Sequence, residues 1–326
     1  MDTSADNPFY IGRRELASLM DVDAYYAATE AAFRAHAEGR TNVPMPLHIP
    51  VEQGGFHAKG AFIAMDHAYA AVKVNSNFPG NPARGLPTIQ GAVLLYDARD
   101  GRLLAILDSI DITSKRTAAA SALAARHLAR RDSRSVAICG CGEQGRTQIA
   151  AIARVMRVER VFAWDLDGGR AERFARDVAK ALSVDAAPVD RVPPADIVVT
   201  ATTSKRPFLT PDDVAPGTFI AAIGADSPHK SEIHPSLMAA AKVVTDLTSQ
   251  AQVMGDLHHA VEAGAMRAAD VHAELGEIVT GHKPGRTDER EVTLFDSTGV
   301  AIQDVAAAAW AYERARCHSR EDGNSE

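Results

Sequence analysis

Residues 135–145 read SVAICGCGEQG, a short apolar run followed directly by three glycines at the spacing GxGxxG. The run predicts a strand, and the residues after Gly142 begin a predicted helix. Between such a strand and helix, one glycine permits the tight turn and the next lets the backbone approach a pyrophosphate. The helix N-terminus adds free N–H groups and the positive end of its dipole. The stretch therefore predicts the phosphate-binding turn of a Rossmann fold.

The chain after this turn alternates between short apolar strands and segments of helix length. Strands are predicted at residues 160–165, 196–202, 218–224 and 242–246, and helices near 143–156, 168–182 and 234–240. This alternation is typical of βαβ units and of a doubly wound parallel sheet.

The chain before the turn has a different pattern. Residues 22–38 carry apolar side chains at helical spacing, and β-rich segments follow, with Asp100-Gly101 as a hairpin turn between two apolar runs. This pattern favours an antiparallel sheet. An Ala-rich helix is predicted from Ile112 to about Arg130, with Thr113 as a candidate cap.

The C-terminal segments are expected to fold back onto the N-terminal part. They comprise a last strand at residues 291–297 and an Ala-rich helix from about Val300 to Arg316. The predicted fold is α/β, with a Rossmann domain at residues 116–298 and an α+β domain formed by residues 1–115 and 299–326.

Length and composition exclude several classes of protein. A chain of 326 residues exceeds the roughly 250 to 300 residues that one core supports, so two domains are expected. A net charge of −7 disfavours a nucleic-acid binder. The three cysteines indicate a reducing compartment, and neither a signal peptide nor an apolar membrane span is visible, so the cytoplasm is expected. The histidines, including His258-His259, show no metal-ligand spacing, and no metal is predicted.

Asp165 ends the strand that follows the glycine turn and lies 25 residues after Gly140. An acid near this distance binds the adenosine ribose hydroxyls and repels a 2′-phosphate, which favours NAD over NADP. Arg170 and Arg206 are residues that would instead accommodate such a phosphate. The alternative for Asp165 is an acid in a solvated turn. Cys141, between two glycines, is interpreted as a small filler and not as a nucleophile.

Three further charged residues stand in apolar or loop settings. Lys73 lies between Val72 and Val74, so on a strand it points to the opposite face, which is either a binding face or solvent. Arg116 is expected in the first helical turn, where it opposes the helix dipole unless an anion lies nearby, and it is either a ligand of such an anion or an ordinary solvent-facing arginine. Asp226 follows a predicted strand at the edge where parallel sheets bind ligands, and is either an acid/base or a helix cap.

Together these segments resemble the ornithine cyclodeaminase/mu-crystallin family, which includes an archaeal-type alanine dehydrogenase and imine reductases. The resemblance runs from about Val72 to Asp304. The matching segments are AVKVNSNFPGNPARGLPT, DITSKRTAAASALAARHLA, GCGEQGRTQ, DIVVTATTSKRPFL, IGADSPHKSEI, AELGEIVTGHKPGR and EVTLFDSTGVAIQD. In this family the N-terminal part and the last helix form the substrate and dimerisation domain, so the resemblance implies a homodimer.

The resemblance also implies roles for individual residues. Lys73 would bind the substrate carboxylate or polarise the imine, Arg116 would hold that carboxylate, and Asp226 would be the acid/base at the reacting amine. The residues that would line the dinucleotide are Thr88, Thr117, Gly140, Gly142, Glu143, Gln144, Asp165, Thr202, Lys230 and Ser297.

Two positions depart from the cyclodeaminase pattern. His48, or Leu47, stands where an Arg is expected, and Lys59 lies in the segment where cyclodeaminases carry an acid for the distal amine of ornithine. Together, His48 and Lys59 suggest a substrate with a second acidic group.

The function expected from these features is that of an NAD-dependent oxidoreductase acting on the C–N bond of a small L-amino acid or its imine. The alternative is a cyclodeaminase, a lyase that uses NAD catalytically and releases ammonia. A third class is a binding protein without turnover, which the presence of Lys73, Arg116 and Asp226 disfavours.

Overall fold

The computed structural model describes residues 7–323 and divides into two compact units. Unit 1 comprises Met1–Arg116 and Val300–Glu326, and unit 2 comprises Thr117–Gly299. The two domain boundaries predicted from the sequence, 115/116 and 298/299, each differ by one residue from these divisions.

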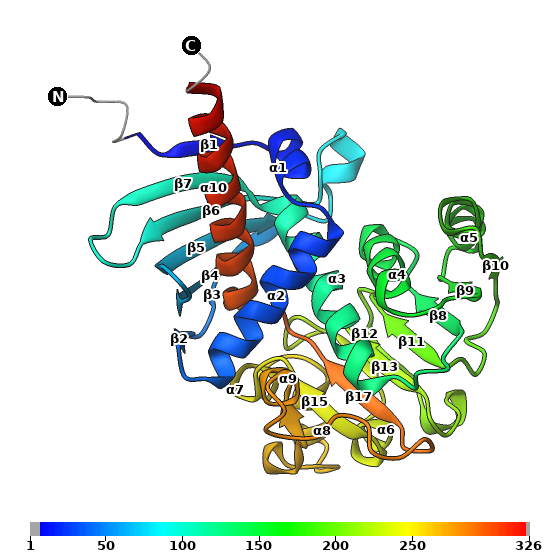
Figure 1. Cartoon of the computed structure of the whole chain (residues 1–326). Helices are drawn as coiled ribbons and strands as arrows, with labels where there is room; N and C mark the ends of the chain where they lie inside the picture. The colour runs from blue at the N-terminus through cyan, green and yellow to red at the C-terminus, as the bar shows by residue number, and fades with distance from the viewer. Residues whose placement is uncertain (1–6, 324–326) are drawn as a thin grey trace. The chain divides into compact units, whose positions relative to one another are not determined.

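Unit 1 is built on a seven-stranded sheet (Figure 1). Its strands are β1 (Phe9–Ile11), β2 (Thr41–Asn42), β3 (Leu47–Val51), β4 (Gly54–Ala64), β5 (Ala68–Asn77), β6 (Ile89–Asp97) and β7 (Leu103–Asp108). Their order is β1-β7-β6-β5-β4-β2, with β3 paired to β4, and every pair except β1 with β7 is antiparallel. The antiparallel sheet is confirmed, and Gly101 (φ +76°) lies in the turn between β6 and β7.

The helices of unit 1 are α1 (Arg13–Leu19), α2 (Val22–Ala37), the start of α3 (Ser109–Leu128), and α10 (Ala301–Gly323), with a 3-10 turn, η2, at Asn81–Arg84. Helix α10 packs against α2 and against β4, β5 and β6 (Figure 1). Its buried face is rich in alanine, so the helix backbone can approach the sheet closely. The predicted cap at Thr113 is wrong, because α3 begins at Ser109 and Thr113 lies inside the helix.

Unit 2 contains an eight-stranded, all-parallel sheet (Figure 1). Its strands are β8 (Ser135–Cys139), β9 (Arg160–Trp164), β10 (Asp185–Pro188), β11 (Ile197–Thr200), β13 (Phe219–Ala222), β15 (Lys242–Thr245), β16 (Ala273–Glu274) and β17 (Thr293–Asp296). The order β10-β9-β8-β11-β13-β17-β15-β16 is doubly wound, as predicted. All carboxyl ends of these strands therefore meet at one edge.

The final strand corrects one sequence expectation. Strand β17 does not fold back onto the N-terminal part, because it pairs with β13 and β15 inside the parallel sheet of unit 2. All four residues of β17 are buried, as expected for a central strand of a parallel sheet that is covered on both faces. Only the helix that follows it, α10, belongs to unit 1.

The remaining elements of unit 2 connect these strands. The helices are α4 (Glu143–Val155), α5 (Gly168–Leu182), α6 (Pro235–Ala240), α7 (Thr248–Ala251), α8 (Asp256–Glu262) and α9 (Leu275–Val279), with short 3-10 turns η3 (Pro211–Asp213) and η4 (Ala268–Asp270). A separate two-stranded sheet pairs β12 (Lys205–Leu209) with β14 (Ser231–Ile233). Helices α4, α5 and α6 lie where the sequence predicts them.

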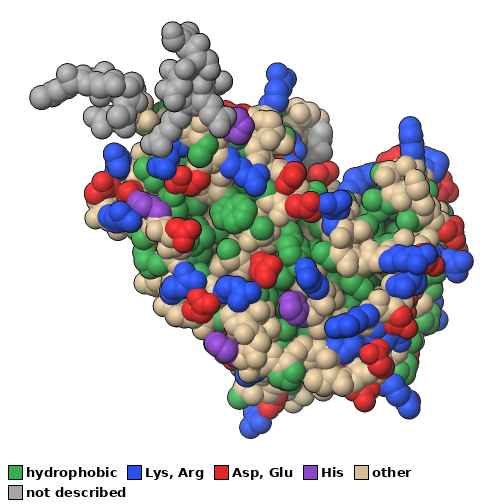
Figure 2. Space-filling view, viewed as in Figure 1, with side chains coloured by type: hydrophobic (Ala, Val, Ile, Leu, Met, Phe, Trp, Pro, Cys, Tyr) green, Lys and Arg blue, Asp and Glu red, His purple; other side chains and the backbone are tan. Residues whose placement is uncertain are grey.

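Acidic and basic side chains are interspersed over the face of the molecule shown in Figure 2. The described residues on that face form no extended basic patch of the kind that binds nucleic acid. Within residues 7–323, the helices are too short or too polar to cross a membrane.

Candidate functional site

The first group of candidate residues lies on one face of the sheet in unit 1. Side chains alternate along β5, and Val72 and Val74 are each 40% exposed whereas Lys73 is 4% exposed. Lys73 therefore points to the face opposite the two valines, as predicted, and this face is the buried one.

Lys73 and Arg116 converge on one buried carboxylate. The Nζ atom of Lys73 lies 2.7 Å from Oδ2 of Asp304, and Nε of Arg116 lies 3.0 Å from Oδ1. Arg116 also donates through Nη1 to Oε1 of Gln303 at 2.7 Å. Because α3 begins at Ser109, Arg116 is beyond the first helical turn, and the expectation that it opposes the helix dipole is wrong. Its anionic partner in the structure is Asp304.

Burial controls the electrostatics of this cluster. Desolvation lowers the pKa of Lys73 to about 7. The positive charges of Arg116 and Lys59 lower this pKa further, whereas the negative charge of Asp304 raises it. Burial opposes ionisation of Asp304 too, but Arg116 and Lys73 keep its pKa below the ordinary value. The cluster therefore contains an ionised carboxylate and a lysine that titrates near neutral pH.

Gln303 and Asp304 were not predicted as site residues. Both are fully buried on α10, and Nε2 of Gln303 has no hydrogen-bond partner among the described residues. A buried donor without an acceptor is costly, so an acceptor from a bound ligand would stabilise this arrangement. The signal in the sequence is an acid and an amide at the start of an otherwise Ala-rich helix.

The two departures from the cyclodeaminase pattern, His48 and Lys59, lie on the same side of the sheet as Lys73. Lys59 on β4 pairs directly with Lys73 on β5, and His48 on β3 pairs with His57 on β4. The Nδ1 atoms of His48 and His57 lie 3.1 Å apart. Thr88, a predicted cofactor residue, precedes β6, and its carbonyl accepts a hydrogen bond from the backbone of Phe78.

The second group of candidate residues lies in unit 2 and begins with the glycine turn between β8 and α4. Gly140 has φ +98°, and a Cβ there would lie 2.6 Å from the carbonyl oxygen of Ala201. A Cβ on Gly145 would lie 2.3 Å from the oxygen of Gly140, whereas a Cβ on Gly142 would meet no atom within 4 Å. Gly140 and Gly145 thus serve backbone packing, and the space in front of Gly142 is open at the N-terminus of α4. These residues fit a dinucleotide pyrophosphate.

Asp165 holds this turn and is not a solvated turn residue. Its side chain is 10% exposed and accepts hydrogen bonds from the backbone N–H groups of Cys141, at 2.9 Å, and Asp167, at 3.0 Å. Arg170 lies nearby, with Nη1 3.7 Å from the carboxylate. Burial raises the pKa of the Cys141 thiol to about 12, which is consistent with a filler and not with a nucleophile.

The other predicted cofactor residues of unit 2 lie at several places. Glu143 and Gln144 are in the first turn of α4, and Oε1 of Gln144 is buried without a hydrogen-bond partner among the described residues. Thr117 is buried in α3. Ser297 is buried after β17, and its hydroxyl donates to Asp246 at 3.4 Å.

Asp226 lies in the loop after β13, at the carboxyl edge of the sheet. Its Oδ1 atom is 2.6 Å from Nζ of Lys230, and its side chain is 55% exposed. The next element is β14, so Asp226 caps no helix and that alternative is wrong. The carbonyl oxygen of Lys230 also makes a 2.8 Å contact with Nε2 of His259.

Glu232, on β14, is a residue near Asp226 in sequence that sequence reasoning missed. Its Oε1 atom accepts hydrogen bonds from the backbone N–H of Thr202, at 2.7 Å, and from the Thr202 hydroxyl, at 2.6 Å. Its Oε2 atom accepts from the N–H of Gly224 at 2.8 Å. Glu232 therefore ties the loop after β11 to the loop that carries Asp226. Burial, together with the charge of Asp256, raises its pKa to about 7.

Unit 2 buries three more carboxylates, those of Asp246, Asp256 and Asp296. Asp256 accepts from the backbone N–H groups of Glu232 and Ile233, and burial raises its pKa to about 6. Asp296 accepts from the N–H of Leu257, and Asp246 accepts from the N–H of Gly299. Two of these acids, Asp246 and Asp296, end apolar strand sequences, which is the only signal the sequence gives for them.

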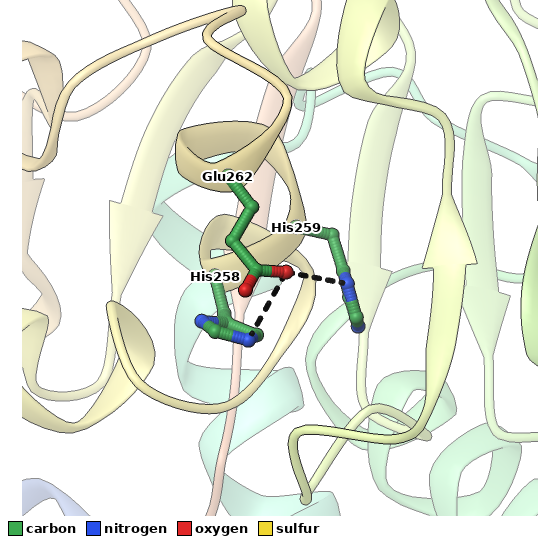
Figure 3. A group of neighbouring side chains, drawn as sticks. All are labelled: His258, His259 and Glu262. Carbon is green, nitrogen blue, oxygen red and sulfur yellow. Dashed lines mark ion pairs between the residues drawn. The ribbon is translucent and has the colours of Figure 1, made fainter.

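His258, His259 and Glu262 come together on α8 (Figure 3). The Glu262 carboxylate lies 3.4 Å from Nε2 of His258 and 3.8 Å from Nδ1 of His259. These three side chains have the chemistry and proximity to hold a metal ion, although their sequence spacing does not predict it. The expected absence of a metal stays a prediction.

The chain is similar to known proteins over most of its length. The pattern of the ornithine cyclodeaminase/mu-crystallin family matches residues 11–319. The chain is 38% identical to the alanine dehydrogenase of Archaeoglobus fulgidus over 304 residues, which cover 93% of this chain and 94% of the relative. It is 36% identical to the iminosuccinate reductase of Paracoccus denitrificans over 310 residues, 94% of this chain and 96% of the relative. A solved structure of an archaeal alanine dehydrogenase dimer with bound NAD superposes with a TM-score of 0.91, at 36% identity and with 96% and 97% of the two chains covered.

Proposed function

The chain belongs to the ornithine cyclodeaminase/mu-crystallin family, and we propose that it transfers hydride between NAD and the C–N bond of a small L-amino acid or its imine. Relatives that act as alanine dehydrogenase and iminosuccinate reductase support this class of reaction. The observation that carries the proposal is the buried cluster of Lys73, Arg116 and Asp304, next to the unpartnered amide donor of Gln303.

The residues of unit 1 bind the substrate carboxylate in this proposal. Arg116 presents a planar set of N–H donors that matches a carboxylate, and Lys73 adds a second positive charge. Asp304 orients both cations and balances part of their charge, so it is a positioning residue. Nε2 of Gln303 gains the acceptor that the described residues do not provide.

Asp226 exchanges the proton of the reacting amine. An exposed carboxylate in a loop at the carboxyl edge of a parallel sheet is suited to proton exchange with a bound ligand. When bound, NAD would accept the hydride from the substrate Cα, so that oxidation of an amino acid would give an imine and a proton taken up by Asp226 or water. Water then converts the imine into a 2-oxo acid and ammonia, and imine reduction is the reverse of the first step.

The cofactor is proposed to be NAD in preference to NADP. Asp165 places a carboxylate at the end of β9, next to the glycine turn, where it would repel a 2′-phosphate. The similar archaeal alanine dehydrogenase was solved with bound NAD.

The chain is also proposed to form a homodimer through the exposed face of the sheet in unit 1. Large apolar side chains that are at least one-third exposed project from this face: Leu47, Ile49, Val51, Phe56, Val72 and Val74. A second copy of the chain would cover them, as exposed apolar patches of this kind mark interfaces. Light scattering on Val74→Asp should detect a smaller species than the wild type, and an unchanged mass would contradict this interface.

A coupled assay tests the reaction class. Purified protein is incubated with NAD and a panel of L-amino acids while NADH absorbance and ammonia are followed together, and the reverse reaction is run with 2-oxo acids and ammonia. We expect NADH to change in step with substrate. Ammonia released from ornithine or lysine without net NADH would identify a cyclodeaminase instead, and no reaction with any substrate would favour a binding protein.

A further inference from the structure

We propose that His258, His259 and Glu262 on α8 bind a divalent metal ion of the late first-row series, with Zn²⁺ as the best fit. The sequence-based expectation of no metal considered the spacing of the histidines alone, whereas the folded helix brings the three side chains together (Figure 3). The metal site is a separate group of residues, so it stands or falls independently of the proposed function.

The helix places one carboxylate within reach of two imidazoles. Glu262 follows His258 by four residues and His259 by three, and both spacings bring side chains together on a helix surface. The neighbouring side chains of Leu257 and Ala260 are fully buried, so the packing of α8 fixes the direction in which the three ligands point.

Hydrogen bonds set the positions of the protons on both imidazoles. Nδ1 of His258 lies 3.3 Å from the carbonyl oxygen of Gln252, and Nε2 of His259 lies 2.8 Å from that of Lys230. A carbonyl oxygen only accepts, so these two nitrogens carry protons. In neutral rings, the other two nitrogens then present lone pairs toward Glu262 (Figure 3). Metal-binding histidines have the same arrangement, because their second ring nitrogen donates to a carbonyl or a carboxylate.

The three facing atoms are separated as the ligands of one ion are. Oε2 of Glu262 lies 3.4 Å from Nε2 of His258 and 3.8 Å from Nδ1 of His259. A charge-assisted hydrogen bond would be shorter, at about 2.7–2.9 Å. Two ligand atoms bound to a tetrahedral zinc ion at about 2.0–2.1 Å lie about 3.4 Å apart. All three atoms lie within 4.8 Å of one another, so small side-chain rotations would bring them onto one ion.

A metal ion matches the charges of this group better than protons do. Protonation of both rings would place two positive charges on imidazoles whose centroids are only 5.1 Å apart. A divalent ion instead needs both rings neutral and pairs with the charge of Glu262. Two imidazole nitrogens and one carboxylate suit Zn²⁺, whereas Mg²⁺ and Ca²⁺ prefer oxygen ligands. Because the Glu262 side chain is 63% exposed, water can complete the coordination.

The site adjoins the segment that carries Asp226. The carbonyl that His259 binds belongs to Lys230, and the side chain of Lys230 pairs with Asp226. A metal ion on Nδ1 of His259 withdraws electron density from the ring, so the N–H on Nε2 becomes a stronger donor. The ion would therefore strengthen the contact between α8 and this segment.

Calorimetric titration with Zn²⁺ tests the proposal on the full chain, prepared without an affinity tag and freed of metal by a chelator. We expect one ion to bind per chain at micromolar concentration, in the wild type and in the matched control His282→Gln, which changes an exposed histidine elsewhere in unit 2. Glu262→Gln and His258→Ala should each weaken the binding of Zn²⁺ by about tenfold or more, because loss even of a group that only orients a ligand costs this much. Circular dichroism verifies the fold of each variant, and excess Mg²⁺ should not compete.

Cobalt substitution identifies the ligands independently of affinity. Co²⁺ should give visible d–d absorption in the wild type that is lost in Glu262→Gln, without the near-ultraviolet charge-transfer band of a cobalt thiolate. Failure of the wild type to bind Zn²⁺ at micromolar concentration would refute the site. Binding that both ligand variants retain unchanged, or a thiolate band, would place the ion elsewhere and refute it as well.

Discussion

The two units solve the problem of burying charge in different ways. In unit 1, the cations Lys73 and Arg116 share one carboxylate, Asp304, so that positive side chains outnumber the acid. Unit 2 instead buries a group of carboxylates, which accept hydrogen bonds mainly from backbone N–H groups. These carboxylates are Glu232, Asp246, Asp256 and Asp296. The first arrangement has more positive than negative side chains, whereas the acids of the second are already bound by hydrogen-bond donors.

The difference indicates what each cluster does. Charged side chains can exchange partners when a ligand arrives, so the cation cluster is suited to substrate binding. Backbone N–H groups are fixed to the chain, so a carboxylate that binds several of them fixes loops. Glu232 illustrates this role, because its two oxygens join the loops after β11 and β13.

The largest effect is expected for Asp304→Asn. Loss of a buried partner leaves two cations without their carboxylate, and the free energy of unfolding should fall by about 3 to 5 kcal/mol. Urea unfolding followed by circular dichroism measures this change. Asp100→Asn, at an exposed turn, is the control and should stay within about 0.5 kcal/mol of wild type. A loss for Asp304→Asn no larger than the control would refute the account of the cation cluster.

The next effect is expected for Glu232→Gln. Glutamine keeps one acceptor oxygen, but its amide nitrogen cannot accept a hydrogen bond, so the contact to either Thr202 or Gly224 is lost. The loop that loses its contact should shift, and the KM for NAD should rise by about tenfold. Glu232→Asp keeps two acceptor oxygens and should restore part of the affinity for NAD. An unchanged KM for Glu232→Gln would show that these loops do not depend on this carboxylate.

Glu232 also predicts a pH dependence of stability. Its pKa is raised from 4.5 to about 7, so between these values the folded chain keeps a proton that the unfolded chain has lost. Stability therefore falls as the pH rises through this window. Urea midpoints at pH 5 and pH 7.5 measure the fall, which should be smaller in Glu232→Gln because the contribution of Glu232 is lost while those of Asp256 and Asp296 remain.

Activity is also expected to depend on pH, in this case through the lysine of the cation cluster. Because the pKa of Lys73 is lowered to about 7, the free protein loses this positive charge as the pH rises through neutrality. The kcat/KM for a carboxylate substrate should therefore decline above about pH 7. Lys73→Arg keeps its charge, so its pH profile should lack this decline. The same decline in Lys73→Arg would assign it to another group.

The last effect, on the preference between the two cofactors, is expected for Asp165→Ala. Removal of this carboxylate should weaken NAD binding by about tenfold and NADP binding by less, because the repulsion of a 2′-phosphate is lost together with the ribose contact. Fluorescence titration with NADH and NADPH measures the two affinities. Equal losses for both cofactors would contradict the ribose assignment and favour a purely structural role in holding the Cys141 backbone.

Local patterns in the sequence predicted the parallel sheet well. Helix α5 and the turn at Gly140 are specified by apolar periodicity and glycine spacing, which act within a few residues. The start of α3 was misplaced because Asp108, the last residue of β7, accepts the N–H of Ile110 and begins the helix earlier than Thr113.

The residues that sequence reasoning missed depend on contacts between distant segments. Asp304 meets Lys73 across 231 residues of chain, and Glu232 meets Thr202 from a different strand. The residues next to Asp304 in sequence are also compatible with a solvated helix, and those next to Glu232 with a loop, so the local sequence does not indicate that either acid is buried. Strand alternation placed Lys73 on the face opposite Val72 and Val74, but the burial of that face and the partner on it are determined by the packing of α10.

The central claim is that this chain moves a hydride to or from the carbon that bears nitrogen, and isotope transfer tests it most directly. The protein is incubated with ammonia, a panel of 2-oxo acids that includes pyruvate and oxaloacetate, and NADH deuterated at the transferable position. Mass spectrometry of the amino-acid product should find one deuterium at Cα, in amounts equal to the NADH consumed. Failure to form an amino acid from any member of the panel, or a product without deuterium, would contradict the account.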